Sequence, residues 1–213
     1  VINNGTILLL GEDGEGYFMI NGGTLEGNSL TAPEGYAIAK NGNSYRIINI
    51  ATAGVKVEYE DGSVQYFNGT VLTENAKKIT LLRDFEGVIN IVGTSSVTYN
   101  VEIDLGGHTI TKNISMGSGV ITVGYANVVI KNGTVVSTST NGTNKPALKV
   151  NSHGNVTVAD DVTLDGGTVQ PAIYLEGGEV ALYGTATSKG GYAITTHGLN
   201  EHNTVITIKD GAT

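Results

Sequence analysis

The sequence predicts an all-β solenoid in which short strands wind into stacked coils of about 20–27 residues. Three observations predict this fold class. Valine, isoleucine and threonine are abundant beside 31 glycines, and this composition favours strands joined by tight turns. One short apolar pattern recurs at a regular spacing. No segment sustains a period of 3.6 residues over ten positions, which argues against a helical repeat.

Composition also excludes several classes of function. The 213 residues contain no cysteine, so neither disulfides nor thiolate metal sites are expected. The net charge is −8 and the only arginines are Arg46 and Arg83, so we expect no nucleic-acid partner. No run of 18 apolar residues occurs, and we expect no membrane insertion in this segment. No signal peptide begins at Val1, so the chain is interpreted as a mature or excised segment.

The repeat is carried by four stretches with Ile or Leu at the third position. They are GVITV (119–123), PALKV (146–150), PAIYL (171–175) and YAITT (192–196). The steps from 119 to 146 to 171 are 27 and 25 residues, and the next step, to Gly191, is 20. Each stretch is followed by a second apolar one: NVVI (127–130), NVTV (155–158), EVAL (179–182) and TVITI (204–208). Glycine, asparagine and aspartate lie between them, as expected for the corners of a solenoid.

Strand alternation predicts which side chains face the interior. One interior column is expected to contain Ile121, Leu148, Ile173 and Ile194. A second is expected to contain Val128, Val156, Val180 and Val205. The neighbours of the first column are expected to face water: Thr122, Lys149, Tyr174 and Thr195.

Residues 51–78 interrupt this pattern. Asp61-Gly62 is typical of a two-residue β-hairpin turn, which would pair Tyr59 with Val64. Thr73 could then cap a short helical turn through residues 74–78. We therefore predict solenoid coils over 1–50, a hairpin and cap or junction over 51–78, and the main solenoid over 79–213.

Several of these stretches resemble a known family. IDLGGHTIT (103–111), preceded by KKITLLRDF (77–85), resembles the coils of bacterial surface proteins with a pectin-lyase-like fold. VVIKNGTV (128–135) and the C-terminal GGYAITTHG and NTVITIKDGAT resemble the same repeats, and EGYAIAKNG near the N-terminus does so more weakly. The resemblance implies a right-handed parallel β-helix. It specifies coil geometry and little chemistry.

Enzymes of that fold make a hydrolase or lyase the main alternative. Asp160-Asp161 with His153 resembles the paired-carboxylate elements of the glycoside hydrolases, but in reversed order. Lyase chemistry would need a strong base, and Arg83 is the only arginine in the main repeat region. Turn acids and a surface ion pair explain these residues more simply, so we expect no catalytic activity and no catalytic residues.

No cofactor is expected. Calcium is possible at carboxylate-bearing corners such as Asp160, Asp161 and Asp165, but the acidic repeat that would indicate it is missing. The four histidines do not have the spacing of a metal site.

The favoured function is a non-catalytic, extracellular structural or adhesive solenoid of a bacterial cell surface or fibre. A phage tail-fibre segment is a further alternative. Its expected partners are other copies of itself through the solenoid ends, or cell-surface glycans or proteins. Outward tyrosines could stack on sugar rings, and the candidates are Tyr125, Tyr174, Tyr183 and Tyr192.

Overall fold

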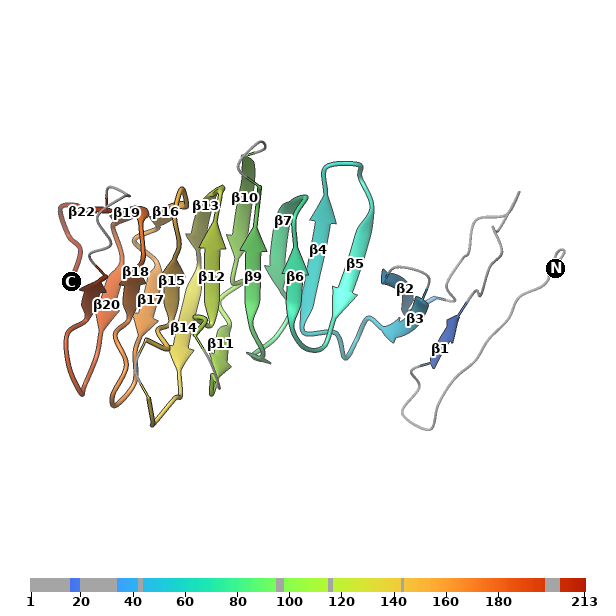
Figure 1. Ribbon diagram of the computed structural model, residues 1–213. Coiled ribbons are helices and arrows are strands. Elements are labelled where there is room, and N and C mark those ends of the chain that lie inside the picture. The colour runs from blue at the N-terminus through green and yellow to red at the C-terminus, as the bar shows by residue number, and fades with distance from the viewer. Residues whose placement is uncertain are drawn as a thin grey trace, which may run out of the picture.

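The computed structural model describes residues 16–19, 34–41, 44–94, 98–114, 117–142, 144–197 and 204–213. Every regular element within these ranges is a β-strand, and the described residues contain no helix. Most of them form a parallel β-solenoid, as the sequence predicts, and it has about five turns. Figure 1 shows the coils stacked side by side, with the C-terminus at one end and a separate small sheet at the other.

Three sheets make up the walls of the solenoid. The eight-stranded sheet contains, in order, β22 (Thr204–Ile208), β19 (Gly178–Leu182), β16 (Asn155–Val158), β13 (Ala126–Lys131), β10 (Tyr99–Asp104), β7 (Ala76–Leu81), β4 (Val55–Tyr59) and β5 (Val64–Phe67). The six-stranded sheet contains β21 (Ile194–Thr196), β18 (Ile173–Leu175), β15 (Leu148–Val150), β12 (Ile121–Gly124), β9 (Ile89–Val92) and β6 (Val71–Thr73). The five-stranded sheet contains β20 (Thr185–Thr187), β17 (Val162–Asp165), β14 (Gly133–Ser137), β11 (Thr109–Lys112) and β8 (Phe85–Glu86).

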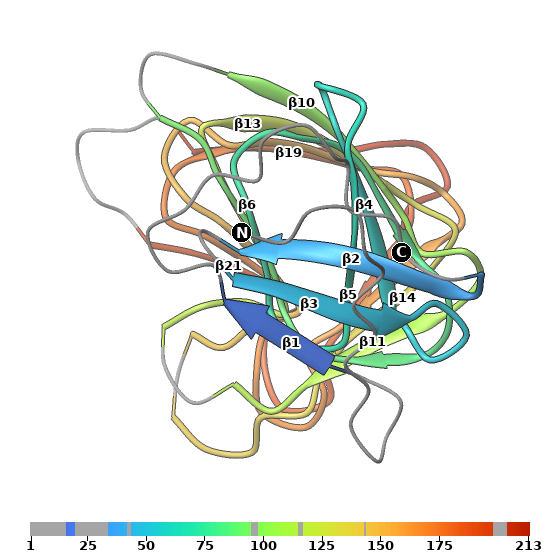
Figure 2. The same ribbon diagram turned by 90° about the vertical axis from the view of Figure 1, so that its right-hand side faces the viewer.

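Each coil takes one strand from every sheet. The first complete coil is β7–β8–β9, the last is β19–β20–β21, and β22 begins another. From β7 onward in the eight-stranded sheet, all neighbouring strands pair in parallel. Figure 2 looks along the solenoid and shows the three walls around a common interior. The coils therefore bury one continuous core, which no single coil could do alone.

The first predicted interior column is confirmed. Ile121, Leu148, Ile173 and Ile194 pair in register across β12, β15, β18 and β21. The second column is confirmed except at its last member. Val180 pairs with Ile206 rather than with Val205, which pairs with Glu179 and is 41% exposed. A shift of one residue moves a side chain to the other face of the sheet, so Val205 points outward.

The prediction that Thr122, Lys149 and Tyr174 face water is wrong. They point away from the core, but all three are buried, and Tyr174 is only 2% exposed. The long connections into the six-stranded sheet fold back over its outer side. Gly119 donates its N–H to Thr122 Oγ1 (2.9 Å), Lys149 Nζ donates to Gly117 O (2.6 Å), and Asn144 Nδ2 donates to the Tyr174 hydroxyl (3.0 Å). Thr195, in the same column, is half-buried.

A β-hairpin closes the N-terminal end of the eight-stranded sheet. Strands β4 and β5 form it, as the sequence predicts, and β4 pairs antiparallel with β7. The predicted register is wrong by one residue, because Glu58 pairs with Val64. Tyr59 donates its N–H to Ser63 O (2.9 Å), which leaves a three-residue loop ending at Gly62 with φ +80°. An antiparallel edge thus ends the stack of parallel strands.

The predicted helical turn after Thr73 is also wrong. Thr73 ends β6, and β7 begins at Ala76 after two residues, Glu74 and Asn75. Burial of Ala76, Ile79 and Leu81 against the core stabilises a strand there instead. The three apolar contacts outweigh the local capping signal.

The described part of residues 1–50 forms an antiparallel sheet instead of the predicted coils. Its order is β1 (Gly16–Met19), β3 (Ser44–Asn49) and β2 (Tyr36–Asn41). Only residues 42–43 separate β2 from β3, and so short a connection can join only antiparallel strands. Figure 2 shows this sheet lying across the N-terminal end of the solenoid. Residues 1–15 and 20–33 lie outside the described residues, so the predicted boundary at residue 50 stays a prediction.

Candidate functional site

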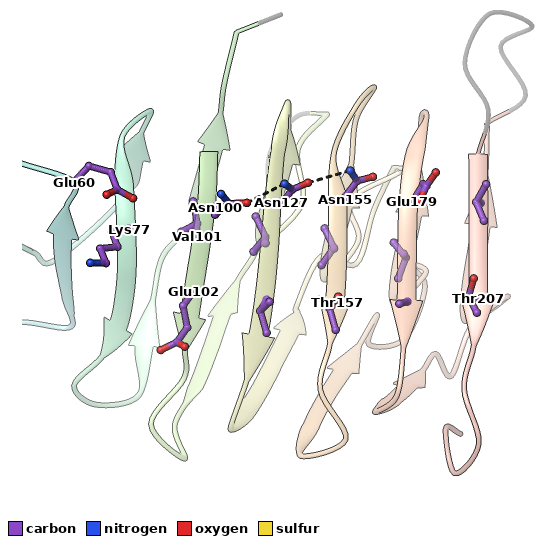
Figure 3. A pocket seen from close by; sticks show the side chains of 16 residues that line it. Glu60, Lys77, Asn100, Val101, Glu102, Asn127, Asn155, Thr157, Glu179 and Thr207 are labelled. Atoms are coloured by element: carbon purple, nitrogen blue, oxygen red, sulfur yellow. Dashed lines mark hydrogen bonds between the residues drawn. The ribbon is translucent and has the colours of Figure 1, made fainter. Parts of the chain in front are cut away.

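One outer face of the solenoid forms a groove. It runs across β10, β13, β16, β19 and β22 on the outside of the eight-stranded sheet and has a volume of about 680 Å³ (Figure 3). This face exposes apolar side chains, Val129 and Val205 among them. Its floor consists of short side chains that occupy one outward column in register: Val129, Thr157, Ala181 and Thr207.

A ladder of asparagine side chains forms one wall of the groove. Asn100, Asn127 and Asn155 occupy equivalent positions on β10, β13 and β16. Asn127 Nδ2 donates to Asn100 Oδ1 (2.9 Å), and Asn155 Nδ2 donates to Asn127 Oδ1 (3.0 Å). All three side chains are exposed. The direction of donation is the same at both steps, which leaves the carbonyl of Asn155 facing the next coil (Figure 3).

The ladder ends at a carboxylate. Glu179 pairs with Asn155 in the register of β16 and β19, and it is exposed. An asparagine at position 179 could continue the ladder by donating to Asn155 Oδ1, but an ionised glutamate can only accept. Within the described part of the chain, no donor reaches either the Asn155 carbonyl or the Glu179 carboxylate. Two acceptors therefore lie one strand spacing apart at the open side of the groove.

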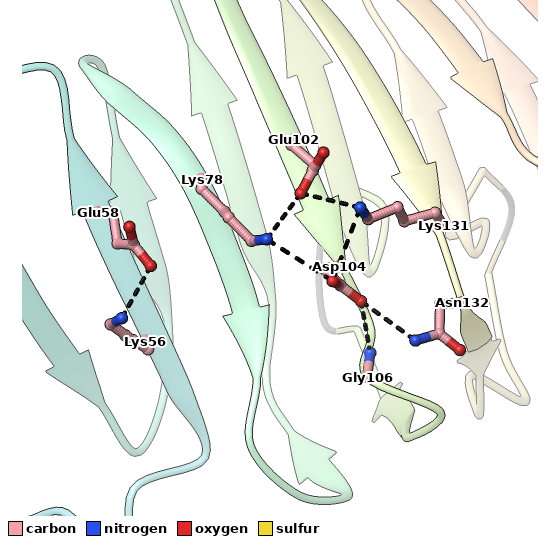
Figure 4. A network of polar contacts seen from close by, with 8 residues as sticks. All are labelled: Lys56, Glu58, Lys78, Glu102, Asp104, Gly106, Lys131 and Asn132. Carbon is pink, nitrogen blue, oxygen red and sulfur yellow. Dashed lines mark hydrogen bonds and ion pairs between the residues drawn. The ribbon is translucent and has the colours of Figure 1, made fainter.

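A network of charged side chains lies on β7, β10 and β13 of the same sheet. Glu102 accepts from Lys78 (2.9 Å) and Lys131 (3.1 Å), and both lysines also lie 3.8 Å from Asp104 (Figure 4). These hydrogen bonds lower the pKa of Glu102. Burial raises the pKa of Asp104. Hydrogen bonds from Gly106 and Asn132, together with the positive charges of the two lysines, more than offset this effect, so the pKa of Asp104 is lowered overall.

The network is structural. Glu102 lines the groove, but its charge is compensated by two lysines, and Asp104 is held by backbone and amide donors at a corner. Figure 4 shows a separate pair, Lys56 and Glu58, on β4. Glu179 therefore has a carboxylate that is available to a ligand, whereas the carboxylate of Glu102 is already paired with two lysines.

The four candidate tyrosines do not form one site. Tyr125 lies at the corner between the six- and eight-stranded sheets and stacks on His153, with ring centroids 4.8 Å apart. Tyr183 follows β19 beneath Lys209, and Tyr192 is 83% exposed in the connection before β21. Tyr174 is buried and hydrogen-bonded, so it offers no ring face to a glycan. None of the four lines the groove.

The residues weighed for catalysis are spread over separate corners. Asp160 and Asp161 lie in the turn after β16, whereas His153 lies in the turn before it. Asp161 Oδ1 accepts the backbone N–H of Asn132 (2.9 Å), which gives it a structural role between coils. Arg83 donates to the carbonyl of Ala51 at the N-terminal end of the solenoid.

The carboxylates weighed for calcium are also apart. Asp165 is the last residue of β17 and accepts the N–H of Gly167 (2.7 Å). Asp160 and Asp161 lie in the turn at the other end of the same strand. Among the described residues, no group of three or more His, Cys, Asp or Glu side chains is close enough to hold a metal ion.

The asparagine ladder and a threonine column were not predicted. The signal for the ladder is a polar residue directly before the inward valine in NVVI, NVTV and EVAL, where the prediction considered only the valine. On the five-stranded sheet, register aligns the outward residues Thr109, Thr134, Thr163 and Thr185. Such cross-strand pairs of β-branched residues stabilise a sheet.

Among the described residues, no helix has the length and apolar character needed to cross a bilayer.

Comparisons with known proteins find no relative of this chain. It matches no protein-family model, no curated protein and no solved structure.

Proposed function

We propose that this chain is a non-catalytic structural and adhesive solenoid of an extracellular bacterial surface protein or fibre. Its coils would then be of the pectin-lyase-like kind that their sequences resemble. The observation that carries the proposal is the groove on the eight-stranded sheet, which crosses five neighbouring strands and presents exposed amides over a floor of short side chains. A repeated lateral surface of this kind suits the binding of an extended polymer of the cell surface, such as a glycan.

The arrangement of acidic residues supports binding rather than hydrolysis. Glycoside hydrolases act through two carboxyl groups on either side of one bond. Here Glu102 is neutralised by two lysines, and Asp160 and Asp161 lie in a turn outside the groove. The groove contains side chains that can hold a sugar polymer, but its remaining carboxylates are far apart. Glu60 follows β4 and Glu179 lies on β19, with four strands of the sheet between them.

The proposal is tested by comparing binding with product release. The chain is incubated with insoluble and soluble neutral glycans and with polyuronates, and both the bound protein and the released sugar ends are measured. We expect retention on at least one glycan without sustained product release. Sustained release would show an enzyme and overturn the proposal, as would the absence of binding to every glycan tested.

A matched pair of variants locates the binding surface. Thr157 on β16 and Thr163 on β17 are both half-buried and outward-facing, but only Thr157 lines the groove. We expect Thr157→Arg to abolish retention, because the long side chain fills the groove, and Thr163→Arg to bind as the unmodified chain does. Equal binding by both variants would place the adhesive surface elsewhere.

Contact through the solenoid ends is the second part of the proposal. Ile208 pairs with Leu182 in an inward column, but it is 63% exposed because no strand of the described residues stacks on β22. The edge of β22 also presents main-chain groups to a further parallel strand. Such an end accepts another coil, and a second copy could supply it.

Sedimentation velocity over a wide range of concentration tests this contact. We expect the 213-residue chain to self-associate and Ile208→Lys to weaken that association, because the variant places a charge on the stacking surface. Val129→Lys, on the lateral face, is the control. A chain that stays monomeric throughout would contradict this part of the proposal without affecting the groove.

A further inference from the structure

We propose that the groove recognises a linear polysaccharide that carries free amino groups, and that Asn155 and Glu179 bind one ammonium group between them. This inference rests on the proposed binding function of the groove and names the chemical class of the ligand. It starts from the end of the asparagine ladder, where the Asn155 carbonyl faces the gap between β16 and β19, Glu179 occupies the paired position on β19, and neither has a donor from the described residues.

An ammonium group is the donor that fits this gap. It carries three N–H bonds and a positive charge, so it can donate to the Asn155 carbonyl and to the Glu179 carboxylate at once. A hydroxyl group has one hydrogen and could satisfy only one of them. The acceptor pair thereby favours an amine over the hydroxyls of a neutral sugar.

Electrostatics also favour a cationic ligand. Four charged side chains line the groove, and Lys78 and Lys131 compensate one of them, Glu102, which leaves Glu60 and Glu179 with a single lysine, Lys77. The chain as a whole has a net charge of −8. A polyuronate would meet repulsion from both, whereas an amine-bearing polymer would be attracted.

The shape of the surface favours a polysaccharide over a peptide. An extended peptide usually binds a sheet through main-chain hydrogen bonds at its edge. This groove lies on the face, where the main-chain groups of β13, β16 and β19 are already paired with their neighbours. Recognition must come from side chains alone, and these repeat once per coil, about 4.8 Å apart. A sugar residue in an extended chain advances by a similar distance.

The experiment uses two oligosaccharides of equal length and linkage: a β-1,4-linked glucosamine oligomer and its fully N-acetylated form. Titration calorimetry measures the binding of each to the full chain at a pH where the amines are protonated. We expect the glucosamine oligomer to bind more tightly. We also expect its affinity to fall as salt is added and as the pH rises through the pKa of the amines.

Glu179→Gln tests the role of the carboxylate. We expect this variant to weaken binding of the glucosamine oligomer about tenfold and to leave the N-acetylated oligomer unchanged. Glu34→Gln is the matched control, because it removes one carboxylate from an exposed turn before β2, outside the groove. We expect it to bind both oligomers as the unmodified chain does.

Three outcomes would overturn the inference. If both oligomers bind equally and Thr157→Arg abolishes binding of both, the groove binds glycans without selecting amines, and the proposed function stands alone. If neither oligomer nor any other glycan binds, the proposed function fails with it. If oligolysine binds as tightly as the glucosamine oligomer and Glu179→Gln weakens both, the groove recognises charge only, and the assignment to a polysaccharide is wrong.

Discussion

The Nζ atom of Lys149 lies 2.9 Å from a carboxylate oxygen of Glu176 on the outer side of the six-stranded sheet. The lysine side chain is buried there, over the ring of Tyr174, and also donates to the carbonyl of Gly117. Glu176 is partly exposed and is the only carboxylate that contacts Lys149 within the described residues. The pair therefore holds a charge beneath the connections that cover this sheet.

Removal of Glu176 should destabilise the fold more than removal of both charges. In Glu176→Ala, Lys149 remains buried without its counter-ion, and we expect the free energy of unfolding to fall by about 2 kcal/mol. In the double variant with Lys149→Met, an apolar side chain of similar length packs on Tyr174, and we expect much of that loss to be recovered. Urea denaturation measures both, and a double variant as unstable as Glu176→Ala would contradict this account.

The burial of Lys149 shows what alternation along a strand can and cannot predict. The alternation in PALKV and PAIYL predicts correctly that Leu148 and Ile173 face the interior. It also places Lys149 and Tyr174 on the outer face, which is correct. It carries no information on what lies over that face, and here distant connections cover it. Exposure depends on the tertiary fold, whereas the direction of a side chain is local.

The repeated Gly-Tyr-Ala-Ile sequence illustrates the same limit. Its second copy leads into β21, which pairs in parallel with β18, as predicted. Its first copy forms β2, which pairs antiparallel with β3. Both copies are strands, so the local prediction is correct, but the length of the connection that follows decides the pairing. The two-residue connection at 42–43 was the signal that an antiparallel hairpin would form.

The candidate site was predictable only in part. Asparagine precedes the inward valine in both NVVI and NVTV, and this spacing places Asn127 and Asn155 in one outward column. The third member, Asn100, lies in a stretch where the repeat is less regular. The open acceptor pair depends on the direction in which each amide donates, and the sequence does not encode that directly.

A second prediction compares two glycines that have almost the same backbone conformation. Gly178 has φ +78° and Gly62 has φ +80°, so alanine is strained at either position. A Cβ atom at Gly178 would lie 2.3 Å from the carbonyl oxygen of Gly154 in the neighbouring coil, whereas at Gly62 it would meet nothing within 4 Å. The difference between the two variants thus isolates the close approach of successive coils.

We expect Gly62→Ala to lower the free energy of unfolding by about 1 kcal/mol and Gly178→Ala to lower it by about 3 kcal/mol or more. Chemical denaturation followed by circular dichroism measures both. Equal losses would mean that the coils can separate at this corner at little cost.

A third prediction uses one interior column at two positions along the solenoid. Ile103 and Ile208 both point inward, and Ile103 is fully buried between Ile79 and Ile130. We expect Ile103→Ala to cost about 3 kcal/mol, because it leaves a cavity that neighbouring coils cannot fill. In the monomer, at low protein concentration, Ile208→Ala should cost less than about 1 kcal/mol, because that side chain is already largely in water. Urea denaturation measures the free energy of unfolding of both variants. Similar losses would contradict the exposure of Ile208 at the end of the solenoid.

The last prediction concerns acid stability. Hydrogen bonds from Lys78 and Lys131 make the pKa of Glu102 lower in the folded protein than its ordinary value of 4.5. A carboxyl group whose pKa is lowered by folding contributes stability that is fully present above its unfolded pKa. That contribution is lost as the pH falls through the lower, folded pKa. The stability of the chain should therefore decline in acid, beginning near pH 4.5.

Glu102→Gln removes this titration and separates it from the rest of the acid response. We expect the variant to lose less than about 1 kcal/mol at pH 7, because the side chain is partly exposed and solvent screens the pair. Between pH 4.5 and lower values, the difference between the variant and the unmodified chain should shrink toward zero. Glu34→Gln, outside the network, should follow the unmodified chain at every pH. Thermal unfolding across the pH series measures all three, and a constant difference for Glu102→Gln would show that its ion pairs do not couple to folding.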